Sequence, residues 1–311
     1  MKPRILITAG DPLGIGPEIT VKTLRSGAAA GLEITVIGDA AALAKAGFRR
    51  GLAALIPCDC PGLDLRRRAP GAAAGAASFK AVKLAAKLIG EGRYDALLTA
   101  PVSKEAWDLA GIPYAGHTEF FRTLTKKELL MGFTSGRAVA ALVTEHISIR
   151  RLPAEITDAA VRVKARLFSE ALGRTGIKRP RIILAALNPH SGDGGLLGRE
   201  ETAVLLPAVR RLRDDGLAIT GPLPSDAAWR AQLSGKSDGL LCLYHDQALV
   251  PLKILPGAAG TVHWTWGLPF PRTSPAHGTA FDIAGRNKAD PQSMKAALAF
   301  AAKWTKGNYE G

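Results

Sequence analysis

Cysteine is scarce in this chain, and its three positions form no bonding pattern. Cys58 and Cys60 are separated by one residue, which is too tight for an ordinary disulfide and differs from the Cys-x-x-Cys spacing of redox sites. Cys242 lies within the apolar segment 239–243, where a thiol is expected in the core. We therefore expect three reduced thiols and no disulfide framework.

Long apolar runs are also missing. None reaches the roughly 18 residues that span a bilayer, and the chain opens directly into the strand-like segment 4–8 without the regions of a signal peptide. Hydrophobic residues make up 47% and charged residues 22% of the 311 positions, as in a globular protein of one large or two ordinary domains. We expect a cytoplasmic protein with no membrane partner.

Acidic residues are few beside basic ones, 27 against 41, which gives a net charge of +14 and a pI of about 10.0. The basic residues are scattered, with short clusters at 66–68, 150–151 and 210–211, and none is interleaved with aromatics. Solvated surface charge is one interpretation, and attraction of anionic substrates such as phosphates and dinucleotides is another. Nucleic-acid binding is a third interpretation, and we expect no such partner.

Strand-like and helix-like segments alternate along the chain. A Pro-, Arg- and Gly-rich stretch at 57–72 is expected to be a loop. Alternation of strands and helices predicts the α/β class, with a largely parallel sheet and helices on both faces. The expected strands are 4–9, 32–38, 95–99, 138–144, 181–187 and 239–243, and the expected helices include 40–46, 73–91, 154–176, 200–214 and 291–304.

Three histidines follow three of these strands: His146, His190 and His245. Ligands of open α/β sheets bind beyond the carboxyl ends of strands, and neutral imidazole is the commonest metal-ligand side chain. The three are therefore candidates for one catalytic metal site that keeps an open position. The alternative is three hydrogen-bonded loop residues, because no local His-x-x-x-His pair fixes the geometry.

Other candidates lie at strand-to-helix junctions. The glycine loop 10–18 is neither Gly-x-Gly-x-x-Gly nor a Walker loop, so an anion cradle at the next helix and a plain turn both stay open. Thr118 is either a helix cap or, with His117, part of an anion site at a helix start. Arg272 is either a bidentate phosphate ligand or a solvated surface residue.

Five segments, taken in order, carry a family resemblance. Residues 10–18, 116–119, 188–201, 244–247 and 267–285 resemble motifs of the 4-hydroxythreonine-4-phosphate dehydrogenase family, NAD-dependent enzymes of vitamin B6 biosynthesis. The resemblance covers nearly the whole chain. Segments 10–18 and 277–285 also resemble loops of isocitrate and isopropylmalate dehydrogenases.

The resemblance implies a fold of two α/β/α domains around a largely parallel mixed sheet, similar to isocitrate and isopropylmalate dehydrogenases. Residues 1–125 with 265–311 are expected to form the cofactor-side domain. Residues 126–264 are expected to form the substrate, metal and dimerisation domain.

The resemblance also implies ligands and the residues that bind them. One divalent metal ion, zinc, magnesium or cobalt, is expected on His146, His190 and His245 of a homodimer with its active site at the subunit interface. The implied substrate-binding residues are His117, Thr118, Lys253, His263 and Arg272. The implied NAD or NADP site comprises Gly14, Gly16, His277, Gly278, Thr279, Asp282 and Gly285.

Position 263 departs from the family, which usually has Asn there, and an imidazole is bulkier and titratable. The neighbouring Trp264 and Trp266 are also unusual. This departure leaves the substrate open among members of the family.

The implied reaction is NAD(P)-dependent oxidation of 4-phosphooxy-L-threonine to 2-amino-3-oxo-4-phosphooxybutanoate, which decarboxylates to 3-amino-2-oxopropyl phosphate. The proton acceptor stays open between Asp246, Lys104 and Asp226, and Asp246 alternatively orients a metal-bound histidine. One alternative is a related dehydrogenase acting on threonate or erythronate 4-phosphate, or on an aromatic cis-dihydrodiol dicarboxylate. Alternatives from other classes are a phosphate acyltransferase and a basic binding protein without chemistry.

Overall fold

The structure is a computed structural model that describes residues 2–255 and 257–305 of the chain. Backbone contacts divide the chain into two compact units, Met1–Glu128 with Ala259–Gly311, and Leu129–Ala258. The boundary expected at 264/265 would cut strand β10 (Val262–Trp266), which pairs along its length with β11 (Arg272–Pro275). His263 therefore belongs to the first unit, because a strand follows its hydrogen-bonded neighbour.

The first unit holds a mixed, mainly parallel sheet in the order β3-β2-β1-β4-β11-β10, with only β10 antiparallel to its neighbour β11 among these six strands. Its strands are short and mostly buried, which suits a sheet covered on both faces. The remaining four are β1 (Arg4–Thr8), β2 (Glu33–Gly38), β3 (Ala54–Pro57) and β4 (Ala96–Thr99).

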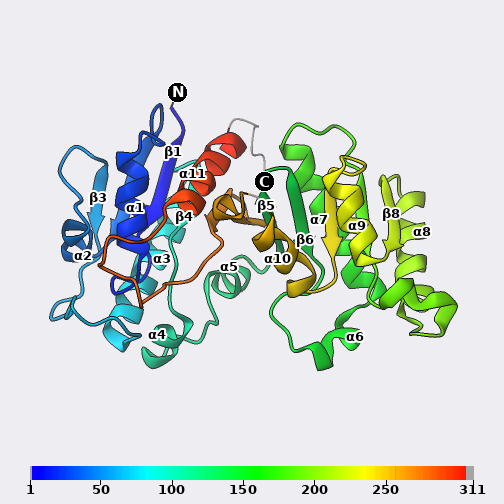
Figure 1. Ribbon diagram of the computed structural model, residues 1–311. Coiled ribbons are helices and arrows are strands. Elements are labelled where there is room, and N and C mark those ends of the chain that lie inside the picture. The colour runs from blue at the N-terminus through cyan, green and yellow to red at the C-terminus, as the bar shows by residue number, and fades with distance from the viewer. Residues whose placement is uncertain (1, 256, 306–311) are drawn as a thin grey trace. The chain divides into compact units, whose positions relative to one another are not determined.

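Helices cover both faces of this sheet. Helices α1 (Gly16–Arg25) and α11 (Gln292–Thr305) lie side by side (Figure 1) and share a core with Ile5, Ile7 and Leu98. Helix α3 (Ala72–Gly90) packs against β1, β2 and β4 and contacts α4. The remaining helices are α2 (Ala40–Lys45), α4 (Lys104–Leu109) and α5 (His117–Thr125).

The second unit has the strand order β5-β6-β9-β7-β8, in which only the β5/β6 pair is antiparallel among its described pairs. Its strands are β5 (Leu130–Ser135), β6 (Ala138–Leu142), β7 (Ile182–Ala185), β8 (Ile219–Leu223) and β9 (Gly239–Cys242). Its α-helices are α6 (Leu152–Glu155), α7 (Asp158–Arg174), α8 (Leu206–Asp214), α9 (Ser225–Leu233) and α10 (His245–Ile254). The loops carry short helical turns at η1 (Ile149–Arg151), η2 (Pro189–Gly195) and η3 (Glu201–Leu205), and η4 (Ala258–Gly260) leads out of the unit.

The α/β class and the largely parallel arrangement are confirmed. The three cysteines are free thiols, as expected. In the described part of the chain, no helix has the length and apolar character to cross a membrane.

The two tryptophans of β10 belong to the core of the first unit. Trp264 and Trp266 on β10 lie with their ring centroids 5.5 and 5.6 Å from that of Trp304 on α11. Their exposed fractions are 2% and 7%. Burial of large aromatic rings against one another explains these residues without a ligand.

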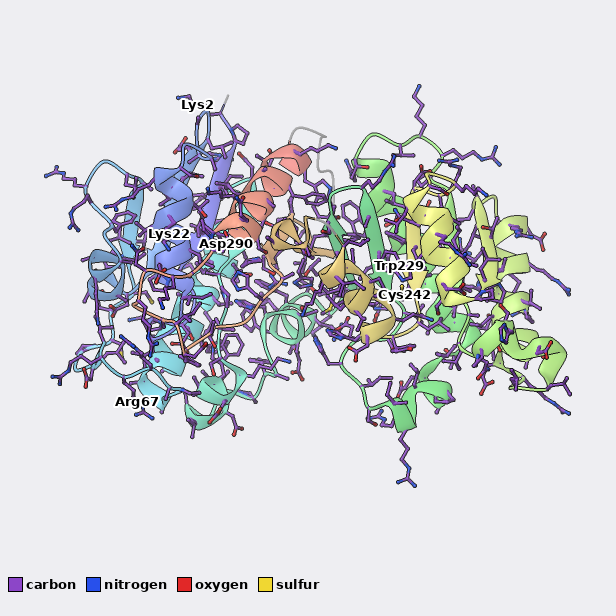
Figure 2. The ribbon with its side chains drawn as sticks, viewed as in Figure 1. Lys2, Lys22, Arg67, Trp229, Cys242 and Asp290 are labelled. Carbon is purple, nitrogen blue, oxygen red and sulfur yellow. The ribbon has the colours of Figure 1, made fainter. Side chains whose placement is uncertain are left out.

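A buried amide holds the strand ends of the second unit together. Gln247 accepts a hydrogen bond from the Leu243 N–H at 2.7 Å and donates to the Ala186 carbonyl and the Ser225 hydroxyl, each at 2.7 Å. The Trp229 indole donates to the Gln247 carbonyl at 2.9 Å. Figure 2 labels Trp229 of α9 and Cys242 of β9, both in the interior of this unit. Gln247 thereby joins the ends of β7 and β9 to the start of α9.

A second contact joins β6 to the same point. Thr144 donates to the Leu243 carbonyl through its backbone N–H at 3.1 Å and its hydroxyl at 2.6 Å. His146 follows Thr144 by two residues, and His245 precedes Gln247 by two. The ends of β6, β7 and β9, each of which leads to one histidine, are thus fixed to one another.

Replacing Gln247 with Met leaves the Leu243 N–H and the Ala186 carbonyl buried without partners. We expect the unfolding free energy of the second unit to fall by about 3 kcal/mol in urea denaturation. Gln292→Met, at an exposed position of α11, is the control and is expected to change little. A Gln247→Met protein within about 1 kcal/mol of the parent would contradict the role given to this amide.

Candidate active site

Two of the predicted metal ligands lie together in the second unit. The ring centroids of His146 and His245 are 5.1 Å apart. His245 is the first residue of α10, and its Nδ1 is hydrogen bonded to the Asp246 carboxylate at 2.6 Å. A carboxylate on one ring nitrogen fixes the tautomer and leaves Nε2 for a metal.

His190 lies on a loop with an unusual backbone. Residues 190–195 all have positive φ, including His190 at 51°, Ser191 at 55° and Asp193 at 44°. The left-handed conformation costs an L-residue about 1–2 kcal/mol, so the surrounding structure must impose it.

The side chain of Glu201 anchors this loop. It is 1% exposed and accepts hydrogen bonds from the Leu187 and Asn188 N–H groups at 2.8 Å and from the Asn188 amide at 2.9 Å. Burial raises the pKa of Glu201, but the hydrogen bonds from Asn188 outweigh burial and hold the pKa below its ordinary value. The carboxylate is therefore fully engaged in shaping the backbone that carries His190.

The third ligand does not complete a metal site within one chain. Among the described residues, no three His, Cys, Asp or Glu side chains come close enough to hold a metal ion. His190 is exposed on its loop and forms no such group with His146 and His245. A pair of imidazoles, one oriented by a carboxylate, fits a divalent cation that takes its remaining ligand from elsewhere.

The other polar candidates are near the surface. Asp226 at the start of α9 is exposed and pairs with Arg230 at 2.7 Å. Lys253 lies exposed in the last turn of α10. Lys104 is the exposed first residue of α4 in the first unit, where a Cβ on Gly116 would lie 3.7 Å from its Cε.

Arg272 is a buried cation of the first unit, and no carboxylate of the described residues pairs with it. It is 2% exposed and donates to the hydroxyls of Thr265 at 2.8 Å and Thr99 at 2.9 Å. Its Nε has no hydrogen-bond partner in the described part of the chain. Burial lowers the pKa of Arg272 to about 9, so the guanidinium stays charged at neutral pH. The interpretation as a surface residue is therefore wrong.

Two imidazoles lie around this guanidinium. His117 opens α5, and its Nε2 is buried with no partner among the described residues. Burial first, then Arg272, then His263 hold the pKa of His117 well below its ordinary value. On β10, the Nδ1 of His263 lies 2.9 Å from the Ser274 hydroxyl. Nitrogen donors thus converge on one place that carries uncompensated positive charge.

Helix α5 adds its N-terminus to this group. Its N-cap is Gly116, at φ 135°, which has no side chain to accept from the first backbone N–H groups. Thr118 is the second residue of the helix, so the alternative that it caps α5 is wrong. An uncapped helix start beside a buried arginine is an anion-binding arrangement.

The two glycine loops expected at the cofactor lie against each other in the first unit. The Ile15 N–H donates to the Thr279 carbonyl at 2.9 Å, and a Cβ on Gly14 would meet that oxygen at 2.9 Å. Gly16 lies against the Ala9 carbonyl, 2.2 Å from a built Cβ. Close backbone packing therefore explains these two glycines.

A cavity of about 340 Å³ opens beside these loops. Gly14 and Pro17 of the first loop and Ala284 and Gly285 of the second are among its lining residues. His277, Gly278 and Asp282 are exposed and lie outside that lining. The structure therefore places part of the predicted cofactor set at one cavity.

Comparison with known proteins shows the family of this chain. Residues 20–301 match the family described as "Pyridoxal phosphate biosynthetic protein PdxA". A 4-hydroxythreonine-4-phosphate dehydrogenase of Geobacter metallireducens is 39% identical over 97% of this chain and 95% of its own length. The chain belongs to the PdxA family.

This PdxA-family chain is also similar to proteins with other names and to solved structures. A D-threonate 4-phosphate dehydrogenase of Salmonella typhimurium is 38% identical over 96% of this chain and 97% of its own. The crystal structure of a 4-hydroxythreonine-4-phosphate dehydrogenase from Klebsiella pneumoniae has a TM-score of 0.87 at 36% identity and covers 98% of both chains. Isocitrate dehydrogenase from Methylococcus capsulatus, with a TM-score of 0.52 at 14% identity over 98% of this chain and 88% of its own, shares the fold. The predicted resemblance is confirmed.

The roles of three residues at this PdxA-family site were not predicted from the sequence: Glu201, Gln247 and Asp11. Asp11 is fully buried in the first glycine loop, where one carboxylate oxygen accepts from the Leu13 N–H at 2.9 Å. The other oxygen has no partner among the described residues. Burial raises the pKa of Asp11 to about 6, against the lowering effect of the Leu13 and Gly14 N–H groups.

This pKa makes stability depend on pH in a definite direction. Between the ordinary value of 3.8 and about 6, the folded chain binds more protons at Asp11 than the unfolded chain, so stability falls as pH rises. Asp11→Asn keeps the hydrogen bond from Leu13 and removes the charge. We expect the variant to gain stability over the parent between pH 4 and 7, by up to about 3 kcal/mol.

Denaturation midpoints measured across that pH range test the prediction. Asp290→Asn is a matched control, because Asp290 is exposed and accepts from the Gln292 N–H at 2.9 Å. A constant difference between Asp11→Asn and the parent at every pH would show that Asp11 does not titrate in this window.

Proposed function

We propose that the chain catalyses the NAD(P)-dependent oxidation of 4-phosphooxy-L-threonine to 2-amino-3-oxo-4-phosphooxybutanoate in pyridoxal phosphate biosynthesis in the cytoplasm. The product then loses CO₂ to give 3-amino-2-oxopropyl phosphate. The observation that carries the proposal is Arg272, a buried guanidinium that has no carboxylate partner within residues 2–255 and 257–305. A phosphate monoester supplies the missing charge and accepts from donors that otherwise lack partners.

The phosphate is assigned to the first unit. Arg272 and His117 bring a buried Nε and Nε2 that lack partners among the described residues. The start of α5 contributes uncapped backbone N–H groups, and His263 and Thr118 complete the set. Lys253 is the further substrate ligand that the family resemblance implies. Anchoring the phosphate fixes the carbinol carbon against the nicotinamide.

The oxidised alcohol is assigned to the imidazoles of the second unit. His146 and His245 would hold a divalent metal with His190 from a second copy of the chain, because the described residues of one copy supply no third ligand nearby. When bound, such an ion lowers the pKa of the alcohol and polarises the ketone. Asp246 orients His245 through its 2.6 Å hydrogen bond. Lys104 and Asp226 are the candidate proton acceptors.

A homodimer follows from the shared metal site. Exposed apolar side chains of the second unit support it: Leu196 is 85% exposed near His190, and Ile254 and Val250 are 77% and 54% exposed on α10, the helix of His245. Apolar side chains left in solvent near ligating residues are typical of surfaces that another chain covers.

D-Threonate 4-phosphate is the second candidate substrate, because a relative with that name is 38% identical and a 4-hydroxythreonine-4-phosphate dehydrogenase 39% identical. The two substrates share the phosphate and differ at C2, which carries an amine or a hydroxyl. The anion site around Arg272 serves both equally, so the discrimination comes from residues that meet C2.

A panel of phosphorylated alcohols, followed by the absorbance of reduced nicotinamide, tests the reaction. We expect 4-phosphooxy-L-threonine to give the highest kcat/KM, ahead of D-threonate 4-phosphate and erythronate 4-phosphate. A higher value for D-threonate 4-phosphate would make the second candidate the function. No turnover with any member would refute the dehydrogenase assignment.

Arg272→Met tests the anion site in the same assay. We expect KM for the phosphorylated substrate to rise at least about 100-fold while KM for the dinucleotide changes little, because a buried charge pair is lost. Thermal unfolding of the free variant is expected to be unimpaired, since the uncompensated charge is gone. Equal effects on both KM values would mean that Arg272 does not bind the phosphate.

His245→Ala tests the metal assignment. Chelation should abolish turnover of the parent, and added divalent metal should restore it. The variant is expected to stay folded by circular dichroism, to bind no metal and to remain inactive when metal is added. Full activity of the variant would end this assignment.

A further inference from the structure

Four basic side chains border the 340 Å³ cavity beside the glycine loops: Arg25, Lys45, Arg67 and Arg68. Arg67 and Arg68 belong to the basic cluster 66–68, for which the proposed function gives no role. They project from the loop between β3 and α3, and Figure 2 labels Arg67 in the first unit. The cavity thus joins the predicted cofactor loops to an unexplained group of cations.

Among the described residues, Asp64 interacts electrostatically with Lys45 and offsets part of the charge of this group. Glu18 is the only acidic residue of the lining, and it already pairs with Lys22 at 2.9 Å and accepts from the Ala289 N–H at 2.8 Å. Lys45 and Arg67 donate to the carbonyls of Leu65 at 2.7 Å and Pro70 at 2.9 Å. Carbonyl oxygens satisfy a hydrogen bond but leave the positive charge in place, so the cavity suits an anion.

The acidic residues that would favour an unphosphorylated ribose are engaged or lie elsewhere. In Rossmann dinucleotide sites an acid after the second strand accepts from the ribose 2′-hydroxyl of NAD, whereas arginine accommodates the 2′-phosphate of NADP, and the same chemistry applies to any ribose site. Asp39 follows β2, but its two oxygens accept from Ala42 at 2.7 Å and Cys60 at 3.1 Å. Asp282 of the second glycine loop is exposed and does not line the cavity.

We propose that this cavity binds the adenosine end of the cofactor and that Lys45, Arg67 and Arg68 bind its 2′-phosphate, which makes the chain selective for NADP. The inference rests on the proposed function, because it assigns the dinucleotide of that reaction. The cavity volume of about 340 Å³ lies within the range of small-molecule pockets. A phosphate dianion among three cations would gain charge-assisted hydrogen bonds that a hydroxyl cannot make.

Nucleotide binding in the absence of substrate and metal tests the proposal by calorimetry. Adenosine 2′,5′-bisphosphate and adenosine 3′,5′-bisphosphate carry the same charge and differ only in the position of one phosphate. We expect the 2′,5′ isomer to bind at least about 10-fold more tightly. The double variant Arg67→Gln, Arg68→Gln is expected to lose that preference, and NADP should lose its advantage over NAD in turnover.

Arg66→Gln is the matched control. Arg66 belongs to the same cluster but pairs with Asp64 at 3.0 Å and does not line the cavity. The control is expected to keep the preference for the 2′,5′ isomer. All three arginines are on the surface, so the variants are expected to fold, and their thermal unfolding checks this.

Equal affinity for the two isomers, no binding of either, or equal losses in the control and the double variant would each overturn the proposal. Turnover with NAD and NADP at equal efficiency would overturn it too, while leaving the dehydrogenase function intact. A preference for the 2′,5′ isomer without turnover of any panel substrate would support this cavity assignment and refute the reaction instead.

Discussion

The side-chain amide of Gln247 is the contact on which the second unit's site depends. It hydrogen bonds to Leu243, Ala186 and Ser225, and so joins the ends of two parallel strands to the start of a helix. Thr144 adds the end of β6 through the Leu243 carbonyl. Because each of these strand ends leads to a histidine, a small buried polar network sets where the imidazoles emerge. A fully satisfied network of this kind is rigid, which ligand placement requires.

The partners of a buried charge distinguish residues that stabilise the fold from residues that bind a ligand. Glu201 is buried, but N–H groups surround it and lower its pKa, so its charge is balanced within the loop that it shapes. Arg272 is equally buried, donates hydrogen bonds to two hydroxyls and lies 5.7 Å from the ring centroid of Phe121, and its pKa is lowered to about 9. No carboxylate of the described residues pairs with that guanidinium. A substrate anion is the simplest group that does.

Much of the fold followed from apolar runs. The segments 4–9, 95–99 and 239–243 predicted buried strands, and helix α3 begins and ends within one residue of the expected range. Strands β3, β5, β8, β10 and β11 were not predicted, because four to six residues with glycines, prolines or isolated polar groups carry too little periodicity. Helix α10 was not predicted either, since Pro251 lies inside it.

The site was predictable only in part, for a different reason. Histidines that follow strands can be predicted to lie close together, because the topology brings strand ends together. His146 and His245 do lie close together. The partners that hold them are not visible: Gln247 and Glu201 are ordinary polar residues whose roles depend on tertiary contacts. The burial of Arg272 likewise depends on β10 and β11, two strands that the hydrophobic pattern did not predict.

The proposed active site depends on one cation shared by imidazoles from two copies of the chain. Hybrid dimers, isolated through two affinity tags, test this most directly. A hybrid dimer that pairs a His190→Ala chain with a His245→Ala or a His146→Ala chain keeps one of its two sites intact. Such a hybrid should show about half of the parent activity, whereas each variant alone should be inactive. The hybrid of His146→Ala with His245→Ala should stay inactive, because one chain supplies both of those residues to each site. If no hybrid regains activity, or if the last one does, the shared metal site described here is wrong.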